Sequence, residues 1–147
     1  MLNVGIASAS PVEVGTALLI VALPENPTLA GIAGIDTATQ GALSRSFEMK
    51  DFRGSRDEIL HLTGLSKGPR RILLVGMGAV TDRKAALRRA ATLAARNAHR
   101  LGVGELVWYS DQLSPEEIEA ITVGLIAGTA FGYYLWDLRG DEKEPET

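Results

Sequence analysis

The sequence predicts an α/β fold, a three-layer α/β/α sandwich with a mixed, mostly parallel sheet. Two runs, "LLIV" (18–21) and "ILLV" (72–75), are continuously apolar, as is typical of central strands covered on both faces. Strand-like segments alternate with helix-like segments, which favours helices packed on a sheet. The chain has 147 residues, 46% of them hydrophobic and 5% aromatic, which is enough for one domain with an aliphatic core.

Five segments have the apolar content and length of strands: 2–8, 16–23, 58–63, 70–77 and 105–110. The segment 58–63, "EILHLT", alternates between apolar and polar residues and therefore suits a peripheral strand. Between Asn26 and Met49 the turn-rich sequence predicts one helix, with Asp36 as its N-cap.

The clearest helix follows Gly78, with Thr81 or Asp82 as its N-cap and Gly102 as its C-terminal glycine. Its apolar positions recur at helical spacing: Leu87, Ala90, Ala91, Ala94, Ala98 and Leu101. Three arginines fall on the opposite face: Arg89, Arg96 and Arg100. This pattern predicts a helix that packs on the sheet with one face and leaves a basic face outward.

A last helix begins at "SPEE". Ser114 is its predicted N-cap, Pro115 takes its first position and Glu117 completes a capping box.

The stretch Ala120–Trp136 has 17 residues without a charge, which is the lower limit for crossing a bilayer. Acidic residues precede it and Gly and Thr dilute it, so we expect a buried helix and no membrane span. Gly124, Gly128 and Gly132 are spaced four apart. In such a helix they would form a smooth stripe that approaches the sheet closely.

The turn Gly76–Met77–Gly78 between a strand and a helix raises the question of phosphate binding. A dinucleotide fingerprint requires a third glycine, and that position is Thr81. The acid expected about 20 residues on has its nearest candidate in Asp111, 35 residues past Gly76. A Walker lysine is also missing. We expect Gly76 and Gly78 to shape a bend, and keep nucleotide binding at these two glycines as the alternative.

Charge is distributed unevenly along the chain. Residues 67–104 carry a net charge of +8, and residues 105–147 carry −8. The basic helix 83–100 is therefore an alternative candidate for nucleic-acid binding. Because no aromatic residue is interleaved for stacking, a solvated or subunit-facing surface is the favoured interpretation.

No catalytic or metal-binding residue is predicted. His61 and His99 are the only histidines, they are far apart in the sequence, and neither has a second ligand at helical spacing. The chain has no cysteine and no G-x-S-x-G motif, so a thiol or serine nucleophile is not expected. The lack of cysteine favours a reducing cytoplasm.

The order of these segments resembles the N-terminal domain of the cytosol (leucyl) aminopeptidases, the M17-type metallopeptidases. The resemblance is carried by Asp36, the stretch Asp51–Gly54, the strand and turn Arg71–Gly78, and a helix that runs to Asp137. The chain departs from the family pattern where Val123 replaces a glutamate and where a closing Tyr-Lys pair is missing.

The resemblance implies a single macro-domain-like domain over residues 1–137 and a linker, 138–147, toward a catalytic domain absent from this chain. The catalytic domain would hold two divalent metal ions of the Mn or Zn type and release N-terminal amino acids from peptides. The domain described by this sequence would be non-catalytic and would serve packing, homo-oligomer assembly (a hexamer in the family) and regulation. Macro-like domains elsewhere bind ADP-ribose, and some bacterial family members bind DNA, which gives two alternative functions.

Overall fold

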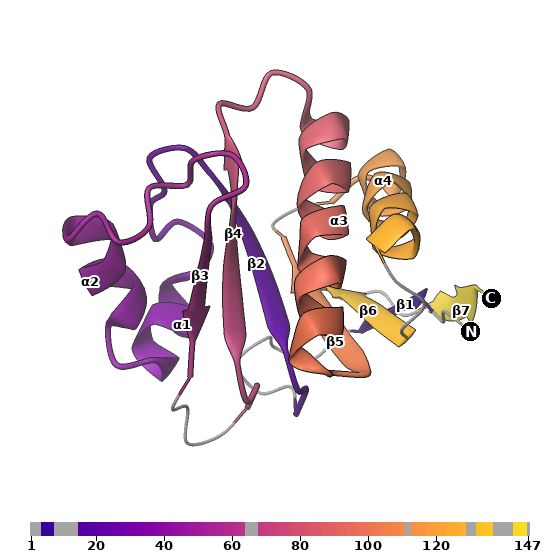
Figure 1. The fold of residues 1–147 in the computed structure, drawn as a ribbon, viewed down its shortest axis with the longest axis horizontal. Helices are drawn as coiled ribbons and strands as arrows, with labels where there is room; N and C mark the ends of the chain where they lie inside the picture. Colours follow the sequence, from indigo (N-terminus) through magenta and orange to yellow (C-terminus); the bar gives the residue numbers. More distant parts are fainter. Residues whose placement is uncertain are drawn as a thin grey trace.

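The computed structural model describes residues 4–7, 15–63, 68–110, 113–128, 132–136 and 143–146. Its elements follow one another along the chain as β1 (Val4–Ala7), β2 (Leu19–Pro24), α1 (Ala33–Ala38), α2 (Ala42–Glu48), β3 (Ile59–Leu62), β4 (Ile72–Gly78), α3 (Arg83–Leu101), β5 (Glu105–Tyr109), α4 (Pro115–Gly128), β6 (Gly132–Trp136) and β7 (Lys143–Glu146). The strands form one sheet in the order β3-β4-β2-β5-β6-β1-β7 (Figure 1).

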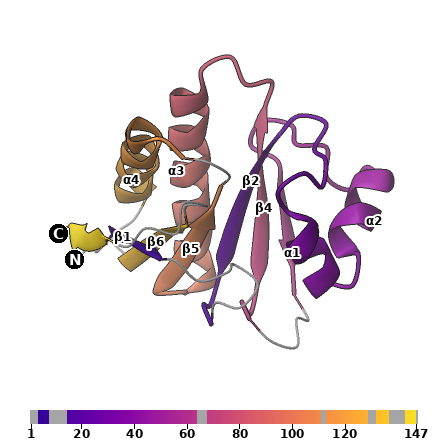
Figure 2. The same ribbon diagram turned by 180° about the vertical axis from the view of Figure 1, so that it is seen from behind.

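The sheet is mixed and mostly parallel, as the sequence predicts. Neighbouring strands from β4 to β1 run parallel, whereas β3 and β7 pair antiparallel at the two edges. Helices α3 and α4 cover one face, and α1 and α2 cover the other, as the opposite views in Figures 1 and 2 show. Each of the five predicted strand segments overlaps a strand, and 58–63 supplies the edge strand β3.

The apolar runs of the central strands are explained by two cores, one on each face. In β2, Ile20 packs in the core under α3 and α4, while Leu19 and Val21 pack in the core under α1 and α2. In β4, Leu73 and Leu74 are divided between the two cores in the same way. Because successive side chains of a strand point to opposite faces, a strand covered on both sides must be apolar at every position.

The prediction of one helix between Asn26 and Met49 is wrong. Two short helices are present, and the chain turns between them at Gln40 and Gly41, both with positive φ. Asp36 is therefore not an N-cap but lies inside α1. Its carboxylate accepts hydrogen bonds from the backbone N of Ser44 (2.9 Å) and from Ser44 Oγ (2.5 Å), in the first turn of α2.

Helix α3 begins and ends as predicted. Asp82 is the N-cap, and its Oδ1 accepts a hydrogen bond from the backbone N of Ala85 at 3.2 Å. Gly102 ends the helix with φ of 73°, a left-handed conformation that a residue with a Cβ adopts only with strain. Five of the six predicted stripe positions are buried and Leu101 is half-buried.

Helix α4 starts at the predicted capping box but is shorter than predicted. Ser114 N donates to Glu117 Oε1 (2.8 Å), and Glu117 N donates to Ser114 Oγ (3.1 Å). The helix ends at Gly128, and Gly132 begins strand β6 between β5 and β1. The aromatic run "GYYLW" favours a strand, and this overrides the four-residue spacing of the glycines.

The glycines of α4 face another helix and not the sheet, which corrects the predicted packing. A Cβ on Gly124 would collide with the backbone O of Arg88 and lie 2.8 Å from the Cβ of Ala91. A Cβ on Gly128 would collide with the Cβ of Ala95. The two helices therefore run parallel, in close backbone contact. In the part of the chain that the structure describes, no helix has both the length and the hydropathy needed to cross a membrane.

Candidate functional site

The two glycines of the predicted phosphate turn have their backbone amides occupied. Gly76 N donates to the backbone O of Glu58 (2.7 Å), and Gly78 N donates to the backbone O of Gly54 (2.8 Å). Asp57 N in turn donates to Gly76 O (3.1 Å). A phosphate would need such N–H groups to point at it, and here they tie the end of β4 to the loop 54–58.

Steric contact explains why these positions are glycines. A Cβ on Gly76 would collide with the backbone O of Ser55. Gly78 has φ of +72°, and a Cβ there would lie 3.0 Å from the Cβ of Arg56. Both glycines therefore allow the loop 54–58 to lie directly on the strand. The candidate acid Asp111 lies outside the described residues.

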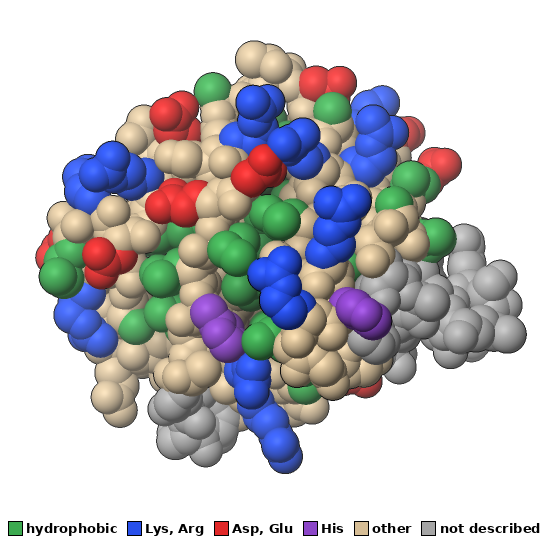
Figure 3. All heavy atoms as spheres, viewed as in Figure 1, with side chains coloured by type: hydrophobic (Ala, Val, Ile, Leu, Met, Phe, Trp, Pro, Cys, Tyr) green, Lys and Arg blue, Asp and Glu red, His purple; other side chains and the backbone are tan. Residues whose placement is uncertain are grey.

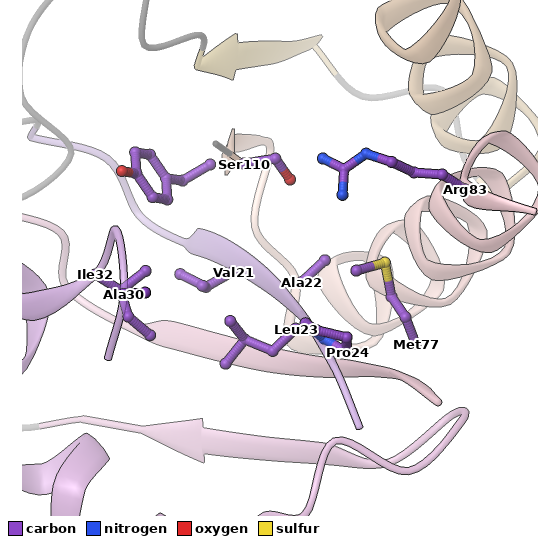
Figure 4. A pocket seen from close by; sticks show the side chains of 10 residues that line it. Val21, Ala22, Leu23, Pro24, Ala30, Ile32, Met77, Arg83 and Ser110 are labelled. Carbon is purple, nitrogen blue, oxygen red and sulfur yellow. The ribbon is translucent and has the colours of Figure 1, made fainter. Parts of the chain in front are cut away.

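A cavity of about 320 Å³ opens beside this turn, at the carboxyl ends of the parallel strands β2, β4 and β5. Its apolar part comes from strands β2 and β4 and from the loop before α1, and its polar part from the end of β5 and the start of α3 (Figure 4). The lining residues are Val21, Ala22, Leu23, Pro24, Ala30, Ile32, Met77, Arg83, Tyr109 and Ser110. Ligands of open α/β sheets bind at this edge.

The polar side chains of the cavity are held by neighbours. Tyr109 OH donates to the backbone O of Gly31 (2.7 Å). Ser110 Oγ accepts a hydrogen bond from Trp108 Nε1 (2.8 Å). The guanidinium of Arg83 points toward Ser110 in Figure 4, and its Nε donates to a carboxylate of α4 at 2.6 Å. The site is therefore preformed, with one cation at its rim.

Sequence reasoning missed this cavity. Tyr109 and Ser110 could have been found from their place at the end of a predicted strand, where ligand-binding side chains of parallel sheets gather. Ala30 and Ile32 carry no such signal, because their approach depends on how the segment before α1 folds back.

The basic helix is divided between an internal contact and an open surface. Arg89 forms a bidentate ion pair with Asp57, with Nε to Oδ1 at 2.8 Å and NH2 to Oδ2 at 2.5 Å. The hydrogen bond and charge of Asp57 raise the pKa of Arg89. The other cations of this helix considered for nucleic acid are exposed: Lys84, Arg88, Arg96 and Arg100. Of the six arginines and lysines of α3, Arg89 thus holds the helix against the loop before β3 and Arg83 pairs with a carboxylate of α4.

The two histidines lie on different elements, His61 in β3 and His99 near the end of α3. Burial, and then the charge of Arg71, lower the pKa of His61. Among the residues that the structure describes, no three His, Asp or Glu side chains form a group that could hold a metal ion.

The strand order and the helices on both faces of the sheet give the chain a macro-domain-like fold. The Thermus aquaticus DarG macrodomain aligns with a TM-score of 0.64 at 13% identity, over 90% of this chain and 97% of that chain. A mutant of the Oceanobacillus iheyensis macrodomain with ADPR aligns with a TM-score of 0.61 at 13% identity, over 92% of this chain and 86% of that one. At such identities the likeness shows the fold alone.

Sequence comparison gives the family. Residues 20–134 match the profile described as the cytosol aminopeptidase family, N-terminal domain, and the chain belongs to that family. It is 36% identical over 114 residues to the chloroplastic neutral leucine aminopeptidase of Solanum lycopersicum, covering 71% of this chain and 19% of that protein. It is 32% identical over 115 residues to a probable cytosol aminopeptidase of Geotalea uraniireducens, covering 77% and 23%.

The structures agree with this assignment. A mutant of tomato leucine aminopeptidase aligns with a TM-score of 0.77 at 20% identity, over 94% of this chain and 33% of that one. The chain spans about a fifth of the length of the curated relatives that it matches. The predicted resemblance and the macro-like fold are confirmed.

Proposed function

We propose that this chain is a non-catalytic domain of a leucyl aminopeptidase. It would pack on a C-terminal catalytic domain and contribute to oligomer assembly and regulation. The parent enzyme would release N-terminal amino acids from peptides, with two divalent metal ions held by the catalytic domain. In such sites a metal supplies an activated hydroxide, and we assign no residue of this chain to that chemistry.

The observation that carries this proposal is the use made of the acidic side chains. Asp36 and Glu117 accept hydrogen bonds at helix starts, and Asp57 binds Arg89. Glu58 Oε1 accepts the backbone N–H groups of Arg53 and of Ser55 in the loop before β3. Each of these carboxylates serves a local structural contact, whereas metal catalysis requires carboxylates that converge on one point.

The test is hydrolysis of leucine p-nitroanilide by the purified chain in the presence of Mn²⁺ or Zn²⁺. We expect no release of nitroaniline above the blank. Hydrolysis that rises with protein concentration and is abolished by a chelator would contradict the proposal. A variant with Glu58 replaced by Gln serves as a control, because it removes a carboxylate used only within the loop.

We further propose that residues 1–137 form the domain and that 138–147 lead toward the catalytic domain. The match of residues 20–134 to the N-terminal domain of the family supports the domain boundary; β7 (Lys143–Glu146), within the last segment, pairs with β1 at the edge of the sheet. A cytoplasmic location and a hexameric parent are part of the same proposal. Gly76 and Gly78 would shape the turn and bind no ligand, since their amides already donate to Glu58 and Gly54.

A second function, binding of a small ligand such as ADP-ribose, is favoured by one observation. The cavity of about 320 Å³ lies at the edge of the sheet where ligands of α/β folds bind. An anionic group of such a ligand would bind near Arg83 at the rim of the cavity and not at the turn Gly76–Gly78. Nucleic-acid binding by the exposed cations of α3 remains a prediction with no further support.

Calorimetry with ADP-ribose tests the second function. The variant Ala30→Trp places an indole at the mouth of the cavity, and Ala33→Trp adds the same group at an exposed position outside its lining. We expect heat of binding that is lost in Ala30→Trp and kept in Ala33→Trp. If millimolar ligand gives no heat with the unmodified chain, this function is rejected.

A further inference from the structure

Strand β3 has a free edge. In the described part of the chain it is the last strand of the sheet and pairs with β4 alone (Figure 1). Gly76 N of β4 donates to Glu58 O (2.7 Å), and in an antiparallel pair the residues that bond to the neighbouring strand alternate. Leu60 therefore bonds to β4, whereas the backbone N–H and C=O groups of Ile59 and His61 point outward from the edge.

The other side of β4 confirms this alternation. Leu19 N of β2 donates to the backbone O of Arg71 (2.9 Å), just before β4, so odd-numbered residues along this strand face β2 and even-numbered ones face β3. The register places Leu60 opposite Leu74, an even-numbered residue. The free edge of β3 therefore offers two donors and two acceptors, at positions about 6.6 Å apart. A further strand bonds to such groups.

Helix α3 is aligned with this edge by one ion pair. Arg89 of α3 binds Asp57, which lies two residues before β3. Because β3 is antiparallel to β4, and α3 connects the parallel strands β4 and β5, the helix and β3 run in the same direction. Three residues follow Arg89 on the same stripe of the helix, at helical spacing: Leu93, Arg96 and Arg100.

The rises of helix and strand place this stripe beside β3. Measured from the ion pair, Leu93 is about 6 Å along the helix and Ile59 about 7 Å along the strand. His61, at about 13 Å, lies between the levels of Arg96 and Arg100, at about 10 and 16 Å. Figure 3 shows exposed hydrophobic side chains between the two histidines, and Lys and Arg side chains along α3.

The two faces of β3 differ in character. Both leucines of the strand pack against the core under α1 and α2 and are half-buried. Ile59 and His61 point to the α3 side, where Ile59 is 39% exposed. Arg96 and Arg100 are exposed and belong to neither ion pair of the described residues. A strand added at this edge would therefore meet apolar side chains on one face and cations on the other.

A second copy of the chain does not suit these charges. Two β3 strands would pair about a two-fold axis perpendicular to the sheet, which leaves both α3 helices on the same side of the joint. Arg96 and Arg100 of one copy would then face the same residues of the other, and like charges oppose association. An acidic strand, in contrast, would be attracted by these arginines.

We propose that β3 is a docking site for an extended, acidic segment of a partner protein, which adds to the sheet as an antiparallel strand. Its backbone bonds to Ile59 and His61. The two residues opposite them share their face of the sheet and are acidic, near Arg96 and Arg100, whereas the residue between them is apolar and lies beside Leu60. Addition of a strand to a free sheet edge is a known mode of peptide recognition. Such a partner is additional to the packing and assembly roles proposed above.

Fluorescence anisotropy with a labelled peptide is the first test. The probe is fluorescein-Ser-Val-Glu-Val-Glu-Val-Ser, which carries two acidic residues on one face of a strand and valines on the other. We expect binding to the unmodified chain with a Kd on the order of 100 µM, weakened by added salt. The matched peptide with both Glu replaced by Lys should bind at least about tenfold more weakly.

Methylation of the peptide backbone tests the strand pairing itself. An N-methyl group on both Glu residues removes the donors that face β3 and should abolish binding. An N-methyl group on the Val between them lies on the far edge of the added strand and should change the Kd by less than about twofold. Attraction by charge alone would not distinguish these two peptides.

Variants of the chain test its own side of the contact. His61→Pro removes one outward donor and keeps the bonds of its neighbours to β4, as edge strands tolerate, and should weaken binding by about tenfold. Arg96→Glu should weaken it about fivefold, and Arg96→Glu with Arg100→Glu should reverse the preference between the Glu and Lys peptides. Arg88→Glu is the matched control, because Arg88 lies on the side of α3 toward Gly124 of α4. Circular dichroism checks that each variant is folded.

A peptide that does not bind at several hundred micromolar chain overturns the proposal. So does binding that is equal for the two N-methyl peptides, for the Glu and Lys peptides, or for Arg96→Glu and Arg88→Glu. A chain that dimerises in sedimentation, with the dimer lost in His61→Pro, would show that β3 pairs with a second copy and would also overturn it. The peptidase assay is independent of all these outcomes, so the docking site can fail while the non-catalytic assignment stands, and the reverse.

Discussion

Two carboxylates of this domain stabilise helix starts from different distances along the chain. Glu117 and Ser114 bond each other's backbone N–H, three residues apart. Asp36 reaches Ser44 eight residues later, across the turn between α1 and α2. Burial acts to raise the pKa of Asp36, but the hydrogen bonds from Ser44 and the charge of Arg45 outweigh it and the pKa is lowered. The spacing of three can be recognised in a sequence, whereas the contact of Asp36 requires knowing that a turn intervenes.

Replacing Asp36 by Ala should therefore lower the free energy of unfolding by about 1 kcal/mol, the usual cost of a lost helix cap. Two hydrogen bonds to the first turn of α2 are removed by this change. Urea unfolding followed by circular dichroism measures it. The exposed Asp51, replaced by Ala, is the control and should change stability by less than about 0.5 kcal/mol. Equal losses in the two variants would show that Asp36 has no capping role.

The ion pair of Asp57 and Arg89 predicts how stability responds to acid. The hydrogen bond from Arg89 holds the pKa of Asp57 below its ordinary value, against the effect of burial and with the charges of Arg89 and Arg56. In the unfolded chain the carboxyl group of Asp57 has a pKa of about 4. As the pH falls, Asp57 therefore binds a proton in the unfolded chain at a higher pH than in the folded chain. The contribution of this ion pair to the free energy of unfolding is therefore complete above the pKa of the unfolded state, and it is lost as the pH falls through the lowered pKa of the folded state.

The variant Asp57→Asn keeps a residue that tolerates the φ of 67° at this position but cannot titrate. We expect its melting temperature to fall less steeply between pH 5 and about 3 than that of the unmodified chain. Because the pair is partly exposed, high salt should reduce the difference. Identical pH profiles at low salt would contradict this assignment.

At the scale of elements, the periodicity of the sequence predicts what each segment is better than what it contacts. The buried strands, the basic helix and its two ends are correctly predicted because local patterns specify them. The glycines of α4 are the opposite case. Their spacing predicts a smooth stripe on the helix, but it cannot show whether that stripe packs against a sheet or against a neighbouring helix. The same spacing also includes Gly132, which the structure places in β6.

The contact between α3 and α4 predicts the effect of adding one methyl group. Gly124→Ala would place a Cβ against the backbone O of Arg88 and the Cβ of Ala91, so the helices must separate. We expect a loss of about 1–3 kcal/mol in the free energy of unfolding. Gly34→Ala in α1 is the matched control, since its Cβ would meet nothing within 4 Å. It should be neutral or raise stability by up to about 1 kcal/mol. A stabilised Gly124→Ala would show that the helices are not in close contact.

At the scale of the molecule, the strand-end cavity could not be predicted because its lining comes from separate segments between Val21 and Ser110. Each segment alone has an ordinary structural explanation, and only the sheet order brings them together. The family, in contrast, could be predicted from the sequence, because it depends on the order of several weak motifs along the chain and not on which residues contact one another. The sequence therefore predicted the fold more completely than the candidate site.

The sheet also determines how the molecule should unfold. Leu73 and Leu74 are neighbours in β4, are both buried, and belong to the two cores on opposite faces. Because β4 contributes side chains to both cores, loss of packing on either face of the sheet should unfold the helices and strands of both layers together. Leu73→Ala and Leu74→Ala are each expected to lower the free energy of unfolding by about 2–5 kcal/mol, with a single transition.

In a chain whose second tryptophan, Trp136, is replaced by Phe, the fluorescence of Trp108, which is buried in the core under α3 and α4, reports on that core. Far-UV circular dichroism reports on the whole backbone. If the cores are coupled through β4, the two signals will change together in both variants, including Leu74→Ala, whose deletion lies on the face away from Trp108. If Leu74→Ala instead loses ellipticity at a lower urea concentration than fluorescence, α1 and α2 unfold separately, and the layers on the two faces are independent units held on one sheet.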